Sequence, residues 1–158
     1  MKTVLVILGS GGHTAEMLAL VDRLGPKYRY VFLVSEDDEV SAKKVKRRMV
    51  VKLRRPTKRG WGLLKTIGSV LTSLMQSRKL VATTRFDMMI GCGPGICVFP
   101  MYFAHRKGRK VVFIETISRV HTFSRTGRMI YRFADAFYVQ WKEQLSRYPK
   151  AVYAGRLL

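Results

Sequence analysis

Short runs of hydrophobic and β-branched residues alternate along the chain with longer segments of helical periodicity. The runs predict strands at residues 3–8, 29–34, 49–53, 87–90, 110–114 and 136–139, with a short last strand at the sequence VYA. The segments between them predict helices at residues 13–24, 61–80, 95–106, 126–133 and 141–146. This alternation is typical of a parallel sheet with crossover helices, so we expect one Rossmann-like, doubly wound α/β domain over residues 1–158.

The charge of the chain points to an anionic partner. Thirty Lys and Arg residues against ten Asp and Glu give a formal net charge of +20, which suits nucleic acid, an anionic membrane surface or a phosphorylated substrate. Cys92 and Cys97 have no Cys/His cluster beside them to suggest zinc. No segment approaches the roughly 18 apolar residues of a membrane-spanning helix, so we expect a soluble or peripheral protein.

The first candidate binding loop is the sequence GSGGHT at residues 9–14, between the first strand and the first helix. Parallel α/β sheets bind ligands at the carboxyl ends of their strands, and glycines at a helix N-terminus favour phosphate. The spacing is not the G-x-G-x-x-G of dinucleotide folds, and the Lys-Ser/Thr of a nucleotide P-loop is missing. A tight strand-to-helix turn with a capping Ser or Thr is the alternative.

Two further loops fall on the same predicted edge of the sheet. The sequence GCGPGIC at residues 91–97 is a second glycine-rich turn, and two such turns suit the two phosphates of a diphosphate. Glu115 ends the fifth strand, where a carboxylate can accept hydrogen bonds from sugar hydroxyls or act as a base. Tight turning is the alternative for the glycines, and a cap or an ion pair with Arg119 is the alternative for Glu115.

Together these three loops resemble one protein family. GSGGHTAEML, GCGPGIC and ETISRVHTFSRTGRMIYRFADAFYVQW are similar to the membrane-associated subunit of the two-subunit N-acetylglucosaminyltransferase of dolichol-linked oligosaccharide synthesis. They also resemble related bacterial capsule and exopolysaccharide proteins, and the N-terminal half of the lipid II-forming transferase MurG. The resemblance implies a GT-B fold, in which the N-terminal Rossmann-like domain holds a lipid diphosphate acceptor and a second domain holds the UDP-sugar.

The resemblance also assigns roles to residues of this chain. His13 matches the proposed general base of MurG-like enzymes, and Glu115 lies in the acceptor-side segment, so both are candidate catalytic residues. The residues expected at the acceptor diphosphate are Ser10, Gly11, Gly12, Thr14, Gly93, Pro94, Gly95 and Arg119. No metal or other cofactor is expected, because helix dipoles and backbone amides neutralise the diphosphate in this fold.

The chain ends at VYAGRLL, where a one-chain GT-B enzyme continues into its second domain. We therefore expect a separate donor-binding subunit that supplies the UDP-sugar, with N-acetylglucosamine as the expected sugar and glucose or glucuronate compatible. Eukaryotic members of the family begin with a membrane-spanning helix, whereas Met1 leads here directly into the first strand. Anchoring is therefore expected from another segment, on the cytoplasmic face of the membrane.

A basic segment at about residues 43–80 is the candidate for that anchoring. It has no carboxylate, and its basic run leads into an apolar helix headed by Trp61, with Leu63, Ile67, Val70 and Leu74 on one stripe. Anionic lipids attract such cations, and Trp suits the headgroup layer. The residues expected at the membrane are Lys46, Arg47, Arg54, Arg55, Lys58, Arg59, Trp61 and Lys65. The alternative is an ordinary crossover helix that packs Leu63, Ile67 and Val70 on the sheet.

Two other functions are compatible with the sequence. The chain could be a non-catalytic recruiter that docks the catalytic subunit at the membrane and binds acceptor without moving a proton. It could also be a nucleic-acid-binding α/β protein that uses its +20 charge. No aromatic-studded RNA platform or helix-turn-helix signature accompanies the basic run, so nucleic acid is not the expected partner.

Overall fold

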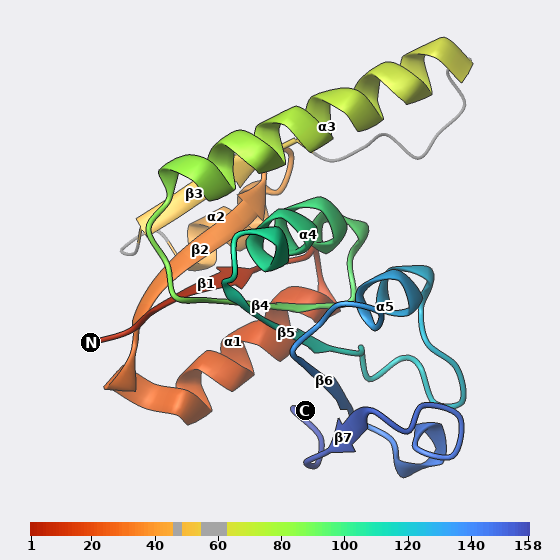
Figure 1. Cartoon of the computed structure of the whole chain (residues 1–158). Coiled ribbons are helices and arrows are strands. Elements are labelled where there is room, and N and C mark those ends of the chain that lie inside the picture. Colours follow the sequence, from red (N-terminus) through yellow and green to blue (C-terminus); the bar gives the residue numbers. More distant parts are fainter. Residues whose placement is uncertain (46–48, 55–62) are drawn as a thin grey trace.

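A computed structural model of the chain describes residues 1–45, 49–54 and 63–158, and for residues 63–65 it describes the backbone only. Seven parallel strands form one sheet in the order β3-β2-β1-β4-β5-β6-β7 (Figure 1). The strands are β1 (Thr3–Ile7), β2 (Arg29–Ser35), β3 (Met49–Leu53), β4 (Met88–Cys92), β5 (Lys110–Ile114), β6 (Ala136–Val139) and β7 (Ala151–Tyr153). The predicted doubly wound α/β fold is confirmed, and the reversal of strand order lies between β1 and β4.

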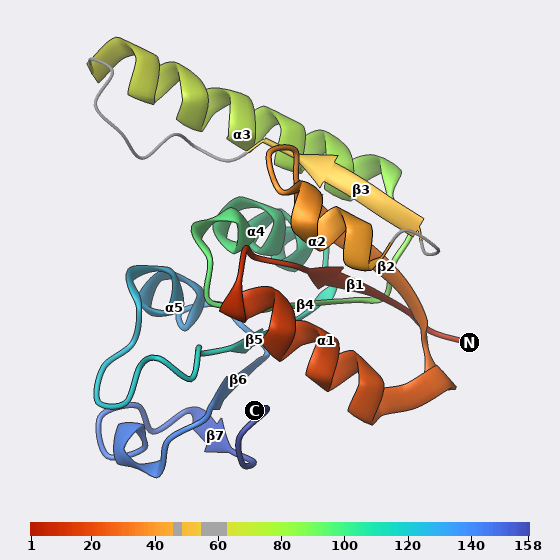
Figure 2. The ribbon, with the colours of Figure 1, turned by 180° about the vertical axis from the view of Figure 1, so that it is seen from behind.

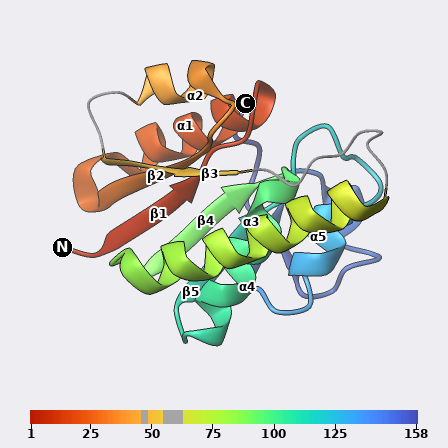
Figure 3. The ribbon, with the colours of Figure 1, turned by 90° about the horizontal axis from the view of Figure 1, so that it is seen from above.

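Helices cover both faces of the sheet, as the turned views in Figures 2 and 3 show. On one face lie α1 (Gly12–Leu24) and α2 (Glu39–Lys44), and on the other lie α3 (Leu63–Thr83), α4 (Val98–Arg106) and α5 (Arg125–Ile130). Three 3-10 turns complete the described elements: η1 (Gly25–Lys27), η2 (Gly95–Cys97) and η3 (Lys142–Gln144). The sheet divides the hydrophobic core into two clusters, one beneath the helices of each face.

The strands are buried on both faces, which explains their nearly continuous hydrophobic sequences. In β1, Leu5 and Ile7 belong to the core cluster beneath α3 and α4, while Val4 and Val6 belong to the cluster beneath α1. The register places Ile7 opposite Gly91 in the neighbouring β4. Consequently the loops that follow β1 and β4 begin side by side at the carboxyl edge of the sheet.

Two local predictions differ from the structure. The segment predicted as a helix at residues 141–146 contains only the three-residue turn η3, so that prediction is wrong. Helix α2 has only six residues and was not predicted, because a helix this short carries almost no periodic signal. Its N-cap is Asp38, whose side chain accepts a hydrogen bond from the backbone of Ser41.

The face of α3 that packs on the protein is not the face that carries Ile67, which the alternative interpretation of the sequence placed against the sheet. Ser73 and Ser77 are buried, and Leu80 and Val81 belong to the core. By contrast Ile67, Leu71 and Met75 are exposed by 47%, 54% and 69%, and they follow one another at intervals of four residues. Helix α3 packs on α4, and its exposed apolar side chains Ile67, Leu71 and Met75 form a stripe on the outside, the α3 stripe.

Candidate functional site

The two glycine-rich loops touch each other at the carboxyl edge of the sheet. The first, residues 8–11, joins β1 to α1, and the second, residues 93–97, joins β4 to α4. A methyl group at Gly9 would lie 2.6 Å from Cγ of Pro94, so the backbone of one loop packs directly on the proline of the other. Helix α1 begins without a side-chain cap, which leaves N–H groups of its first turn available to an anion.

His13 lies between the two loops, on the first turn of α1. Its imidazole rests on the backbone of Gly93, where an added Cβ atom would be 2.2 Å from Cε1 of the ring. The φ angle of Gly93 is +76°, in the region that favours glycine. About 30% of the His13 side chain is exposed, so the ring is supported on one side and open to solvent on another.

Glu16 follows one helical turn after His13 and is only 1% exposed. Oε2 of Glu16 lies 3.3 Å from Nδ1 of His13, and the Thr116 hydroxyl donates to the same oxygen of Glu16 over 3.1 Å. The Ile117 N–H and the Gln140 amide donate to Oε1 over 2.8 and 2.6 Å. Burial alone would raise the pKa of Glu16, but the contacts with His13, Ile117 and Gln140 outweigh it and lower the pKa to about 2.

Cys92, at the end of β4, completes a group of potential metal ligands with His13 and Glu16. The ligand atoms of these three residues lie within 4.8 Å of one another. Burial raises the pKa of the Cys92 thiol well above its ordinary value, and the negative charge of Glu16 acts in the same direction. Since a thiol binds metal as its thiolate and the Glu16 oxygens already accept several hydrogen bonds, the three groups suit hydrogen bonding better than metal binding.

Thr14 was predicted to contact the acceptor diphosphate, but its side chain points into the protein. It is 1% exposed, and its hydroxyl contacts the Gly9 carbonyl and, over 2.7 Å, the hydroxyl of Ser41 on α2. Ser41 also donates to the Gly9 carbonyl over 3.2 Å and to Oδ2 of Asp38 over 2.8 Å. These contacts hold the first glycine loop from beneath, so Thr14 fixes the shape of the loop.

Glu115 is fully buried at the end of β5. Its Oε1 accepts the Thr116 N–H over 3.1 Å, and its Oε2 accepts the N–H and hydroxyl of Ser124 over 2.9 and 3.2 Å. Burial raises the pKa of Glu115, and the bonds from Ser124 and Thr116 only partly oppose that rise. The carboxylate therefore holds the loop between β5 and α5, while the predicted Arg119 side chain is exposed on that loop.

The other predicted residues divide into two groups. Ser10, Gly11, Gly12 and Gly95 are exposed around His13, and Pro94 is half-buried between the loops. Of the predicted membrane residues, Arg54 is exposed just after β3, and Lys65 lies in the first turn of α3. The remaining ones lie outside the described residues: Lys46, Arg47, Arg55, Lys58, Arg59 and Trp61.

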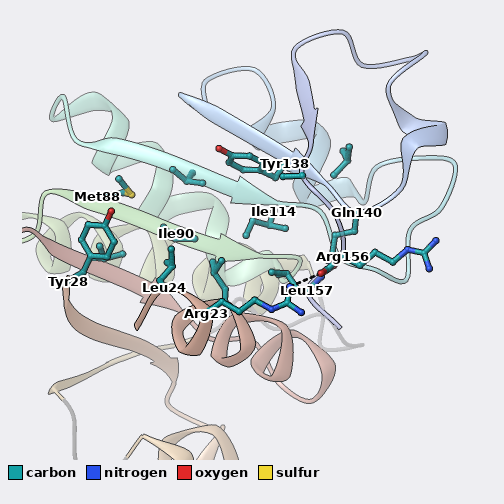
Figure 4. Close-up of a pocket in the computed structure, with 16 residues that line it drawn as sticks. Arg23, Leu24, Tyr28, Met88, Ile90, Ile114, Tyr138, Gln140, Arg156 and Leu157 are labelled. Carbon is teal, nitrogen blue, oxygen red and sulfur yellow. Dashed lines mark hydrogen bonds between the residues drawn. The ribbon is translucent and has the colours of Figure 1, made fainter. Parts of the chain in front are cut away.

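An apolar pocket of about 410 Å³ opens on the α1 face of the sheet, between α1 and residues 154–157 (Figure 4). Ile90, Ile114 and Leu24 are among its hydrophobic walls, and Arg23 donates to the Arg156 carbonyl over 2.8 Å at its side. Gln140 lines this pocket and also contacts Glu16, so one side chain joins the pocket to the site.

Sequence reasoning missed Glu16, Gln140 and Ser41. Glu16 lies three residues after His13 in a predicted helix, a spacing that places two side chains on one helix face, so it could have been found. Gln140 and Ser41 carry no such signal, because their approach to the site depends on the order of the strands.

Comparison with solved structures defines the class of the fold. MurG of Acinetobacter baumannii matches 97% of this chain with a TM-score of 0.77 and a sequence identity of 15%. A UDP-N-acetylglucosamine 2-epimerase matches 98% of this chain with a TM-score of 0.75 and a sequence identity of 12%. This chain spans only 45% and 48% of those two chains. The fold is therefore that of one Rossmann-like half of a GT-B protein, as predicted.

The sequence defines the family. Residues 4–157 match the family described as "Oligosaccharide biosynthesis protein Alg14 like", and the chain belongs to this family. The Rattus norvegicus protein named UDP-N-acetylglucosamine transferase subunit ALG14 is 33% identical over 181 residues, which cover 98% of this chain and 82% of the relative. The Schizosaccharomyces pombe protein of the same name is 34% identical over 175 residues, which cover 98% of this chain and 82% of that relative. The predicted glycosyltransferase subunit is thereby confirmed. Within the described residues, no helix has the length and apolar character needed to cross a membrane.

Proposed function

We propose that this chain, as a single domain, is the acceptor-binding subunit of a two-component, inverting glycosyltransferase. A partner subunit binds the UDP-sugar, which we take to be UDP-N-acetylglucosamine because that donor stands in the names of the relatives. The acceptor is a sugar linked to a polyprenyl diphosphate. Its hydroxyl attacks the anomeric carbon, the bond from that carbon to UDP breaks, and the configuration inverts.

Backbone amides of the two glycine loops bind the acceptor diphosphate in this proposal. Ser10, Gly11 and Gly12 are exposed where α1 begins, and Gly95 is exposed at the start of η2. Both turns lie at one edge of the sheet and touch through Gly9 and Pro94. Two adjacent turns that open helical segments without a side-chain cap match two adjacent phosphates, and Arg119 on the neighbouring loop adds positive charge.

His13 takes the proton of the attacking hydroxyl. The observation that carries this assignment is the position of its imidazole, which rests on Gly93 between both loops and is 30% exposed. A base must lie within hydrogen-bond reach of the hydroxyl, and the exposed side of the His13 ring, beside both loops, is where the sugar next to a bound diphosphate would lie. Glu115 is fully buried and bonded to Thr116 and Ser124, so its part is to hold the acceptor-side loop.

The basic segment and the α3 stripe bind the anionic, cytoplasmic surface of the membrane that carries the acceptor. Ile67, Leu71 and Met75 are exposed along one side of α3, and the chain before that helix is rich in Lys and Arg. Apolar side chains can enter the headgroup layer while cations attract acidic lipids at about 1 kcal/mol each. The acceptor site is then close to the lipid that it receives.

The proposal is tested with the complex of this chain and its donor-binding subunit, assayed on vesicles that contain the lipid-linked acceptor. His13→Ala should lower kcat by about 100-fold or more, with little change in the acceptor KM. His105→Ala is the matched control, because His105 is exposed near the C-terminal end of α4, the end of that helix opposite the second glycine loop. Near-normal turnover of His13→Ala with intact assembly contradicts the base assignment and supports the non-catalytic recruiter. A panel of UDP-sugars on the same complex identifies the donor.

A further inference from the structure

We propose that Glu16 is the positioning residue of His13. It holds the imidazole in the tautomer with a proton on Nδ1, which leaves Nε2 as the atom that receives the acceptor proton. This inference rests on the proposed function of His13 as the base. It adds a residue that the loop sequences alone do not indicate, because Glu16 is buried beneath the loop and touches no part of the expected acceptor.

The first step concerns the direction of the bond between His13 and Glu16. Oε1 of Glu16 accepts from Ile117 and Gln140, and Oε2 accepts from Thr116, in each case from an N–H or O–H group. A carboxylate surrounded by donors is ionised and can only accept hydrogen bonds. The contact of 3.3 Å therefore requires that Nδ1 of His13 carry the proton and donate it.

The second step concerns what fixes Glu16 itself. The N–H of Leu157 donates to Oε1 of Gln140 over 2.8 Å, so the amide nitrogen of Gln140 must face the other way. That nitrogen donates to Glu16 and to the backbone carbonyl of Glu115 over 2.6 and 3.1 Å. One chain of hydrogen bonds thus runs from Leu157 through Gln140 and Glu16 to His13, and every bond fixes the orientation of the next group.

The third step concerns the opposite side of the ring. Gly93 packs on Cε1 and Nδ1, so the ring cannot turn over without leaving both Gly93 and Glu16. Among the described residues, none makes a hydrogen bond to Nε2 of His13. A ring supported in this way presents one free nitrogen in a fixed place, which is the arrangement that general-base catalysis requires.

Nuclear magnetic resonance tests the tautomer directly. The chain is labelled with ¹⁵N-histidine and studied in the complex at about pH 8.5, above the ordinary histidine pKa of about 6.5. The signals of His13 are assigned by their loss in His13→Asn, which separates them from His105 and His121. We expect a protonated Nδ1 and an unprotonated Nε2, and a shift toward the Nε2–H tautomer in Glu16→Gln. An Nε2–H tautomer in the unmodified protein, or no change in Glu16→Gln, overturns the proposal.

Kinetics of the complex test whether Glu16 acts through His13. Glu16→Gln should lower kcat about 10- to 100-fold with less than about a threefold change in acceptor KM. In a His13→Ala background the same substitution should change kcat by less than about twofold, because its target is gone. An equal loss in both backgrounds overturns the proposal. Glu143→Gln is the matched control, since Glu143 is exposed on η3.

Two further measurements keep the outcomes distinct. If Glu16→Gln does not fold or does not bind its partner subunit, Glu16→Asp is used, which keeps the charge but withdraws the oxygens from Nδ1, and the same spectra and rates decide. If His13→Ala keeps normal turnover, the proposed function fails, while the ¹⁵N spectra still decide whether Glu16 sets the tautomer of His13.

Discussion

The imidazole of His13, which follows the first glycine loop, packs on the backbone of Gly93 in the second glycine loop. A methyl group at position 93 would lie 2.2 Å from Cε1 and 2.4 Å from Nδ1 of His13. The two residues are 80 positions apart in the chain and meet because β1 and β4 are neighbours in the sheet. The geometry of the candidate base therefore depends on a glycine in the other loop.

Gly93→Ala should displace His13 and destabilise the protein. The φ angle of +76° is unfavourable for alanine, and the new methyl group would overlap the ring, so we expect a loss of about 2–4 kcal/mol and a fall in kcat. Gly108→Ala is the matched control, since its φ is +67° but no heavy atom lies within 4 Å of the added carbon. It should cost only about 1–2 kcal/mol. Urea unfolding measures both, and equal losses would contradict the packing of His13 on Gly93.

Stability should fall in acid partly because of Glu16. The pKa of Glu16 in the folded protein is about 2, below its ordinary value of 4.5, so the ionised carboxylate is more stable in the folded protein than in the unfolded chain. That contribution is fully present above the ordinary value and is lost as the pH falls toward about 2. Between about pH 6 and pH 3, the melting temperature of the unmodified chain should fall more than that of Glu16→Gln. Parallel curves would show that Glu16 is not stabilised in this way.

Thr14 should matter for the stability of the first loop rather than for contact with the acceptor. Thr14→Val removes the hydroxyl contacts with the Gly9 carbonyl and Ser41 inside the protein, which should cost about 1–3 kcal/mol. Thr14→Ser keeps the hydroxyl and should keep both the stability and the acceptor KM. Thermal unfolding and acceptor titration check the pair of variants. A raised KM in Thr14→Ser with normal stability would show that the side chain contacts the acceptor instead.

The α3 stripe should bind membranes. Replacing Ile67, Leu71 and Met75 together by Ser should weaken binding to vesicles with acidic lipids by about tenfold or more without lowering stability, because all three are exposed. Val40→Ser, on α2 at the opposite face of the sheet, is the control with a similarly exposed apolar side chain. Sedimentation with vesicles measures the effect, and binding to duplex RNA is measured at the same salt concentration. A clear preference for RNA would contradict the membrane proposal.

Much of the fold was predictable because its signal is local. The strands at 49–53, 110–114 and 136–139 were predicted with the bounds that the structure shows, since each is a hydrophobic run bounded by polar or turn residues. The turn η3 was mistaken for a helix, and α2 was missed, because segments of three to six residues are decided by tertiary contacts. The burial of α3 also differs from the predicted stripe, because tertiary contacts decide which face of a helix is covered: Ser73 and Ser77 are buried, while Ile67 of the predicted stripe is exposed.

The sequence by itself determined the class of fold, the family and the loops that form the candidate site. Glycines after hydrophobic strands mark the carboxyl edge of a parallel sheet whatever the strand order is. Only the tertiary structure decided which side chains meet there. The order β1-β4-β5-β6 brings Gly93 to His13, and Thr116, Ile117 and Gln140 to Glu16. These contacts join residues up to 124 positions apart, and a pattern of neighbouring residues contains no information on such distances.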